Sequence, residues 1–407
     1  MAADGIIAGL QLLRQPNFAR GFVAYLVSYL GTAMAPIALA FGVLELTGSA
    51  STTAYVIAAP TAAQIAVVLV GGALADRTSR QYLLVGADFT AMSAQLLIAW
   101  LFLSGTASLP LLIGLMLING TAHAFAAPAM AGFIPQLVTR SELQAANALL
   151  ALARNSAFTV GAAIAGMLVA FVGAGVAILI DALTFAVSGV LIASMRPAAQ
   201  QVERGPSLVH ELRLGWQEFT RHKWLWTIVL QFTVIMAALQ AVWGLLGPAV
   251  TRDQMGGAAD WGFVAATMGV GTLTGGLIAL RIRVRRPMLT ASFCVFFFAL
   301  LPLALSVPAP LVILCLASFA GGVSGELFGV LWMTTLHKTI PGPMLSRVAA
   351  YDHLGSLCLA PLGVVAGGLL YESIGARLTL LVAAGLVIVP TLAVLMVREV
   401  RELEVHG

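Results

Sequence analysis

The chain has 407 residues, of which 60% are hydrophobic and only 9% are charged, and its formal net charge is +4. Soluble globular domains carry about 25% charged residues, so a chain with so few charges cannot cover a water-soluble globule. The three cysteines all fall inside apolar stretches, which indicates buried thiols rather than a disulfide framework.

Twelve apolar stretches follow one another along the chain. A hydrocarbon core about 30 Å thick takes about 20 helical residues to cross, and each stretch is long enough. The predicted spans are 21–45, 52–73, 82–104, 110–134, 147–171, 174–195, 224–247, 261–280, 288–306, 310–334, 347–370 and 375–397. The sequence therefore predicts an all-α integral membrane protein with twelve transmembrane helices.

A short charged loop, GGALADRTSR from Gly71 to Arg80, separates the second and third spans. It carries Asp76, Arg77 and Arg80 between two long apolar runs. Such a loop is expected to form a tight hairpin at a membrane surface.

The placement of the basic residues predicts the orientation of the chain. With the N-terminus inside, all of the 21 basic residues except Arg154, Arg252 and Arg377 lie in inner segments or at inner helix ends. The opposite orientation would put nearly every one of them on the translocated side. Both termini are therefore predicted to be cytoplasmic. The distribution by membrane side also argues against a nucleic-acid partner.

The polar segment 197–223 interrupts the hydropathy pattern. Its apolar residues Leu208, Leu212, Trp216 and Phe219 recur at helical spacing, which predicts an amphipathic helix at the inner interface. A helix that binds a partner protein is the alternative. The predicted organisation is a six-helix bundle over 1–196, a cytoplasmic linker over 197–223 and a second six-helix bundle over 224–407.

The two halves of the chain repeat one another. The fifth span contains GAAIAG at Gly161–Gly166, and the eleventh contains GVVAGG at Gly363–Gly368. The stretch GGLIALR after the eighth span also resembles GGALADR after the second. Two bundles in parallel repeat are typical of transporters that work by alternating access.

The loop pattern G-x-L-A-D-R-x-x-R, in this position, resembles the loop between helices 2 and 3 of the major facilitator superfamily, and the resemblance covers essentially the whole chain. Four stretches are similar to the twelve-helix drug and siderophore exporters related to the bacterial enterobactin exporter: Leu46–Ala50, Ala145–Leu149, Ala153–Asn155 and Ala360–Gly363. The resemblance implies a monomeric secondary transporter of a bacterial inner membrane that exports an amphipathic small molecule, with protons as the coupling ion. Uptake or lipid translocation, and a non-transporting scaffold or sensor, are the alternatives.

The resemblance also places helices 2 and 11 together. Asp76 would then clasp the N-terminus of helix 11 near Ser346, where free N–H groups and the helix dipole favour a negative charge. Arg77 and Arg80 would complete this inner gate. The alternative is a solvated loop that only sets topology.

Ionisable residues within spans are costly unless they are paired or face water. Glu326 in the tenth span is the foremost candidate to bind a proton or a cationic substrate, with Gly321, Gly322 and Gly325 leaving space around it. The resemblance implies that helices 1, 4, 7 and 10 line a central cavity, which would include His123. A structural hydrogen-bond partner is the alternative for both residues.

Arg154 lies within the fifth span and requires an acidic partner, either Asp88 or Asp352. Structural locking and gating are equally compatible with such an ion pair. Asp181 in the sixth span is expected to be an interior structural acid.

The remaining candidates are polar, aromatic and glycine residues. Gln231, Gln240, Tyr29 and Trp332 are expected to give the cavity an aromatic, weakly polar lining that suits a bulky amphipathic ligand, although such aromatics also face lipid or packed helices. The glycines Gly161, Gly166, Gly363 and Gly367 permit close helix packing, either as static contacts or as a sliding interface between the halves.

Several classes of chemistry lack support in the sequence. It contains no G-x-x-x-x-G-K-[ST] loop, so ATP-driven transport is not expected. No His, Cys or Asp cluster has metal-ligand spacing, and no nucleophile–base arrangement is visible. The predicted partners are a small molecule, protons and membrane lipids, without a cofactor, a metal or a catalytic residue.

Overall fold

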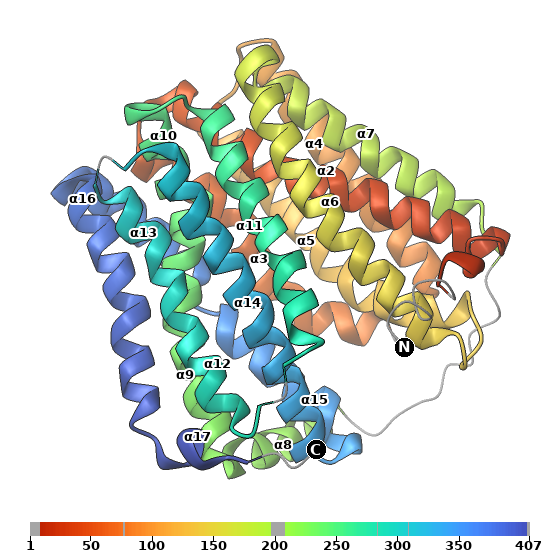
Figure 1. Ribbon diagram of the computed structural model, residues 1–407. Helices are drawn as coiled ribbons and strands as arrows, with labels where there is room; N and C mark the ends of the chain where they lie inside the picture. The colour runs from red at the N-terminus through yellow and green to blue at the C-terminus, as the bar shows by residue number, and fades with distance from the viewer. Residues whose placement is uncertain (1–8, 76–77, 197–207, 283, 308, 405–407) are drawn as a thin grey trace. The chain divides into compact units, whose positions relative to one another are not determined.

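The computed structural model describes residues 9–75, 78–196, 208–282, 284–307 and 309–404, and every regular element among them is a helix (Figure 1). The first half contains α2 (Pro16–Thr47), α3 (Ala50–Ala75), α4 (Arg80–Leu103), α5 (Leu109–Phe133), η1 (Ile134–Gln136), α6 (Leu143–Val172) and α7 (Ala174–Ala193). The second half contains α8 (Leu208–Arg221), α9 (Lys223–Ala241), η2 (Val242–Leu246), α10 (Gly247–Gln254), α11 (Ala258–Ala279), α12 (Pro287–Val295), η3 (Phe296–Ala299), α13 (Leu300–Leu305), α14 (Leu311–Thr339), α15 (Gly342–Leu357), α16 (Ala360–Leu395) and α17 (Arg398–Glu402).

The helices account for all twelve predicted spans. Ten helical stretches in the described part of the chain are long and apolar enough to cross a membrane. The helix α3, with 26 residues, adds one more crossing. The stretch from Arg347 to Leu395 holds two crossings rather than one, because the backbone turns at Gly375, where φ is 83°. Together these helices supply the twelve crossings that the sequence predicts.

The chain divides into two compact units. Unit 1 comprises residues 1–48 and 59–204, and unit 2 comprises residues 49–58 and 205–407. The first turns of α3 therefore belong to unit 2, whereas the rest of this helix belongs to unit 1. The amphipathic helix α8 falls within unit 2.

Unit 1 is built on close contacts between helices rich in small residues. The helix α2 packs against α6 and α7, and α4 packs against α5 and α7. A Cβ added to Gly161 of α6 would lie 2.7 Å from the carbonyl oxygen of Leu30, so the backbones of α6 and α2 approach closely there. Membrane helices without a hydrophobic driving force between them depend on such packing.

Unit 2 has a larger apolar core. The helix α9 packs along α16 and α15, and α11 packs along α14. The core includes Trp224, Phe328 and Trp332, which are 2%, 9% and 6% exposed. At one end of this unit α8 packs against α15 and α9, and α17 packs against α9 and α12 (Figure 1).

The predicted amphipathic helix is present as α8. Phe219 is buried, and the exposed ring of Trp216 lies 5.4 Å from the ring of Tyr351 on α15. The described side chains of α8 therefore include an aromatic contact with unit 2. The side chains of Leu208 and Leu212 lie outside the described part of the structure.

Two of the predicted spans depart from a regular α-helix close to a proline, which lacks a backbone donor. The predicted seventh span, 224–247, covers α9 and a π-helical turn, and the helix continues past its end into α10 at Gly247-Pro248. The eleventh span breaks between α15 and α16, just before Pro361. A proline cannot donate to the carbonyl four residues earlier, so a helix bends or restarts there.

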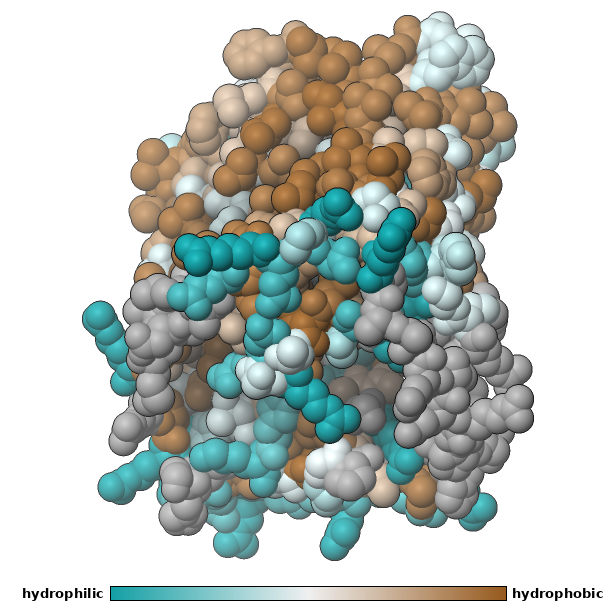
Figure 2. All heavy atoms as spheres, turned by 90° about the vertical axis from the view of Figure 1, so that its right-hand side faces the viewer, coloured by the Kyte–Doolittle hydropathy of each residue, from teal (hydrophilic) through white to brown (hydrophobic). Residues whose placement is uncertain are grey.

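The surface carries the apolar residues expected of a lipid-facing protein. Figure 2 shows hydrophobic side chains over the upper part of one face and hydrophilic side chains gathered toward its lower end. Phe171 and Met396 are 83% and 79% exposed. In water such a surface would aggregate, whereas in a bilayer it contacts lipid.

Candidate transport and gating sites

Glu326 lies on the side of α14 that faces α11. A Cβ added to Gly275 would lie 3.0 Å from the Cβ of Glu326. A Cβ added to Gly276 would lie 3.9 Å from the Oε1 of Glu326. Gly325, which the sequence suggested as a source of space, faces the ring of Phe298 instead. The room around the Glu326 side chain is therefore provided by the glycine pair of α11.

His123 of α5 packs inside unit 1. Its ring centroid lies 5.7 Å from that of Phe185 on α7, in an edge-to-face arrangement. The residue is half-buried, so part of its ring is used in packing, and its place in a cavity stays a prediction.

Two of the predicted ligand-binding side chains make internal hydrogen bonds in unit 2. Gln231 is 3% exposed and donates from Nε2 to Thr391 Oγ1 of α16 at 2.9 Å. Trp332 is 6% exposed and donates from Nε1 to Asp352 Oδ2 of α15 at 2.9 Å. In the described structure their polar groups are thus used in contacts within unit 2, and their role in lining a cavity stays a prediction. Gln240 of α9 is half-buried.

The two acids predicted as partners of Arg154 make hydrogen bonds to other residues, and the ion pair stays a prediction. Asp88 Oδ2 of α4 accepts a hydrogen bond from the Ser188 hydroxyl at 2.7 Å, and Asp352 accepts the indole N–H of Trp332. Both acids thus have neutral donors in the described structure. Arg154 is exposed on α6 and lies within electrostatic reach of Tyr25.

The predicted aromatic residue Tyr29 of α2 is half-buried. Its ring centroid lies 4.4 Å from that of Tyr25, with an angle of 36° between the planes. The two phenol rings form one aromatic surface on α2. Among the predicted ligand-facing aromatics, Tyr29 keeps more exposed surface than Trp332.

Of the predicted inner gate, only Arg80 lies within the described residues; Asp76 and Arg77 lie outside them. Arg80 Nη1 donates to the carbonyl oxygen of Gly132 at the end of α5, at 2.6 Å. The neighbouring Gln81 donates from Nε2 to the carbonyls of Ile192 and Met195. The start of α4 is therefore tied to the ends of α5 and α7.

The predicted packing glycines lie at equivalent helix contacts in the two units. Gly161 of α6 meets α2, while Gly363 of α16 meets the backbone of Ala237 on α9. A Cβ added to Gly367 would lie 2.9 Å from that of Ala241. Gly166 is buried in α6. Each observed contact of Gly161, Gly363 and Gly367 lies within one unit, as static packing expects, and the sliding interface stays a prediction.

One contact was not anticipated from the sequence. Glu372 accepts hydrogen bonds from Ser49 Oγ at 2.7 Å, from the backbone N–H of Ser51 at 3.0 Å and from Ser51 Oγ at 2.6 Å. Its carboxylate therefore caps the N-terminus of α3, where N–H groups lack helical partners. One turn earlier, a Cβ added to Gly368 would lie 2.8 Å from the carbonyl oxygen of Ala50.

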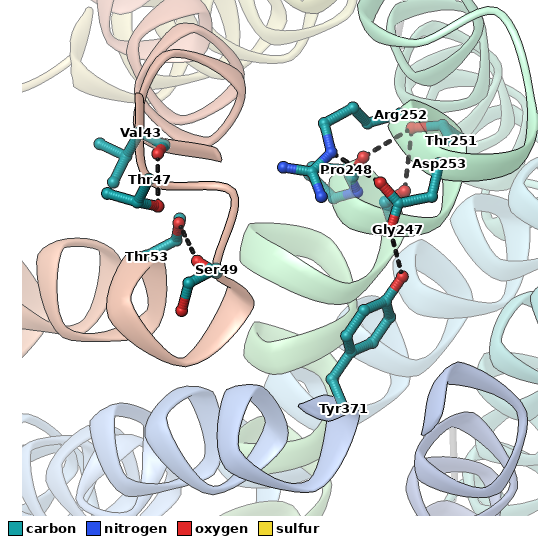
Figure 3. Close-up of polar contacts among 10 residues, drawn as sticks. All are labelled: Val43, Thr47, Ser49, Thr53, Gly247, Pro248, Thr251, Arg252, Asp253 and Tyr371. Carbon is teal, nitrogen blue, oxygen red and sulfur yellow. Dashed lines mark hydrogen bonds and ion pairs between the residues drawn. The ribbon is translucent and has the colours of Figure 1, made fainter. Parts of the chain in front are cut away.

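Figure 3 shows the neighbouring polar contacts. Tyr371 donates its hydroxyl to Asp253 Oδ2 at 2.9 Å, and Thr53 donates to the carbonyl of Ser49 at 2.7 Å. The only local signal for the cap is Ser49 after Gly48, which marks a helix start. Its acidic partner lies 323 residues away, so the pairing requires the fold.

A second polar seam runs between α4 and α7. Gln95 Nε2 donates to Asp181 Oδ2 at 2.7 Å, two turns from the bond between Ser188 and Asp88. Asp181 is 0% exposed and Gln95 is 3% exposed. Among the described residues, no group of three or more His, Cys, Asp or Glu side chains is arranged to hold a metal ion.

The sequence profile of a family described as transmembrane secretion effectors, a branch of the major facilitator superfamily, matches residues 7–406. An uncharacterised transporter of that superfamily from Bacillus subtilis (strain 168), YvqJ, is 21% identical over 362 residues, covering 86% of this chain and 85% of the relative.

Solved structures share the fold. A mutant form of the nucleoside transporter NupG superposes with a TM-score of 0.74 at 14% identity, covering 93% of this chain and 99% of NupG. A bacterial homologue of the human lysosomal transporter Spinster, inward-facing and unoccupied, gives a TM-score of 0.74 at 12% identity, covering 95% of this chain and 98% of that one.

Proposed function

The chain belongs to the transmembrane secretion effector family of the major facilitator superfamily, and we propose that it exports an amphipathic small molecule in exchange for protons. Family membership makes it a secondary transporter rather than an enzyme. The proposed direction of transport, out of the cell, rests on the family match: the family is described as secretion effectors, and its profile matches residues 7–406. Parallel repeats of six helices suit alternating access, in which a site opens to each side of the membrane in turn.

Glu326 is the proposed site of proton or cation binding. It is the carboxylate of α14 that lies against Gly275 and Gly276 of α11, and it is half-buried. An acid within a membrane span that is neither fully buried nor freely exposed is suited to exchange a proton. Tyr29, also half-buried, is the proposed aromatic contact for an amphipathic ligand.

Further parts of the proposal rest on the sequence. Asp76, with Arg77 and Arg80, forms the inner gate. The two bundles cover 1–196 and 224–407 and are joined by the 197–223 linker. The protein acts as a monomer in a bacterial inner membrane with both termini in the cytoplasm, as the distribution of basic residues favours.

The proposal is tested in inside-out membrane vesicles energised to an acidic interior, with ethidium as an amphipathic cationic probe. The wild-type protein should accumulate ethidium, and collapsing the pH gradient should release it. Glu326→Gln should lose this accumulation, because the amide neither binds nor releases a proton. Glu45→Gln, which removes an exposed carboxylate near the end of α2, should keep it.

Accumulation at the wild-type rate by Glu326→Gln would contradict the role of this residue. Ethidium movement into right-side-out vesicles, driven by an inward proton gradient, would instead indicate uptake. Uptake is the second transport function considered for this fold, since the NupG structure is that of a nucleoside transporter.

A further inference from the structure

The seam between α4 and α7 contains two polar pairs at matched positions. Asp88 and Gln95 are seven residues apart on α4, and Asp181 and Ser188 are seven residues apart on α7. Because the helices run in opposite directions, Asp88 meets Ser188 and Gln95 meets Asp181. Each buried acid therefore receives one neutral donor from the other helix.

The two pairs differ in which of their oxygen atoms lack a hydrogen-bond partner. Asp181 Oδ1 and Gln95 Oε1 are buried and have no hydrogen-bond partner. Asp88 has no such oxygen among the buried unsatisfied atoms of the described residues. Both orphan oxygens accept hydrogen bonds when the acid is ionised and donate none, so they cannot satisfy one another.

Besides Gln95, the side chain of Thr184 lies within reach of the Asp181 carboxyl group. The hydroxyl of Thr184, one turn along α7, donates to the carbonyl of Asp181 at 2.7 Å and is therefore in use. The backbone of α2 closes over the carboxyl group at Gly31, since a Cβ added there would clash with Asp181 Oδ1. An ionised carboxylate in such a place would be desolvated and only half satisfied.

A single proton resolves both deficits. On Asp181 Oδ1 the proton would make a hydroxyl able to donate to Gln95 Oε1, while Gln95 Nε2 continues to donate to Asp181 Oδ2. The acid and the amide then form a cyclic pair with two hydrogen bonds. The balance is one carboxylate plus one proton giving one carboxylic acid, with no other bond made or broken.

We propose that Asp181 and Gln95 form a proton-binding site in unit 1, and that transport requires this proton in addition to the one proposed for Glu326. The second clause rests on the proposed proton coupling. A purely structural pair would be served equally well by two amides, whereas the carboxyl group retains a proton that it can release.

The helices packed against α4 and α7 carry other titratable groups. The helix α4 contributes Asp88, two turns from Gln95, and α5 contributes His123, whose ring packs on Phe185 one turn from Asp181. The helix α2 contributes the Tyr25–Tyr29 pair, and α6 contributes the exposed Arg154. None of these is bonded to Asp181 in the described structure, so the site depends on Gln95.

Infrared difference spectroscopy on the purified full-length protein at neutral pH reads the proton directly. The spectrum should contain a protonated-carboxyl C=O band that disappears in Asp181→Asn and persists in the control Asp88→Asn. Gln95→Leu should shift this band rather than remove it, because the acid keeps its proton but loses the amide acceptor. If no protonated-carboxyl band disappeared in Asp181→Asn, the proposal that Asp181 holds a proton would be overturned.

Ethidium transport in proteoliposomes tests the coupling. Asp181→Asn should keep counterflow but lose its stimulation by a pH gradient, and it should unfold at the wild-type temperature because asparagine can form the same cyclic pair. Full stimulation in this variant would overturn the inference even with the band present. If the wild-type protein itself ignored the pH gradient, the proposed function would fail, while the infrared band would still report on the proton site.

Discussion

The loop between α5 and α6 is held by one carboxylate. Glu142 Oε2 accepts hydrogen bonds from the hydroxyl and the backbone N–H of Thr139, at 2.7 and 2.9 Å, and Oε1 accepts from Gln15 Nε2 at 3.0 Å. These donors favour the charged form and lower the pKa of Glu142 below its ordinary value of 4.5. The hydrogen bond from the Thr139 hydroxyl makes the largest contribution.

This lowered pKa predicts a pH-dependent contribution to stability. A group with a lower pKa in the folded state stabilises the protein above its unfolded pKa, and the contribution is lost as the pH falls through the folded pKa. Glu142→Gln should therefore lower the unfolding temperature in detergent at neutral pH, and the difference should shrink below about pH 4.

Glu45→Gln provides the control for this measurement, since Glu45 is an exposed carboxylate of α2. A Glu142→Gln effect of the same size at acidic and neutral pH would show that the charge of Glu142 is not what stabilises the loop.

Single residues also show where sequence reasoning ends. The sequence identified Asp88, Asp352, Gln231 and Trp332 as polar groups in an apolar setting, which is correct. It could not assign their partners, because Ser188 and Thr391 are common residues of apolar helices, and only their position on a facing helix makes them donors or acceptors. A short polar motif predicts that a bond is needed, not which bond forms.

At the scale of elements, the close contacts between helices depend on the positions of glycines, which have no side chain. The two glycines Gly363 and Gly385 both lie on α16. A Cβ at Gly363 would collide with the backbone of Ala237 on α9, whereas Gly385 has no heavy atom within 4 Å of its Cβ position. The repeat of glycine motifs in the fifth and eleventh spans was visible in the sequence, and both motifs lie at helix contacts.

These two sites give a matched pair of substitutions. Alanine is favoured over glycine in a helix by about 1 kcal/mol, so Gly385→Ala should leave the unfolding temperature unchanged or raise it. Gly363→Ala should lower it, because α16 must move away from α9. Thermal unfolding in detergent measures both, and equal effects would refute the close contact at Gly363.

The cap on α3 makes a separate prediction. Glu372→Ala removes the acceptor for the N–H of Ser51, so hydrogen exchange at the first turn of α3 should become faster. Ser373→Ala is the control, because Ser373 donates only to carbonyls of its own helix, Leu369 and Leu370. Unchanged protection at Ser51 in Glu372→Ala would mean that the carboxylate does not hold the helix start.

At the scale of the whole molecule, composition and hydropathy were sufficient for the all-α fold and the twelve spans, because a bilayer accepts few other arrangements. The π-helical turn in the seventh span and the break in the eleventh were not predicted, although Pro248 and Pro361 lie close to them. The assignment of the first turns of α3 to unit 2 was also beyond the sequence. It depends on contacts with α16, more than 300 residues away.

The central claim is transport by alternating access, driven by a proton gradient. Counterflow of ethidium in proteoliposomes containing only the purified protein tests it most directly. The account predicts counterflow without any energy source, and net accumulation when a pH gradient is imposed. The absence of counterflow, or accumulation that is indifferent to the pH gradient, would contradict it.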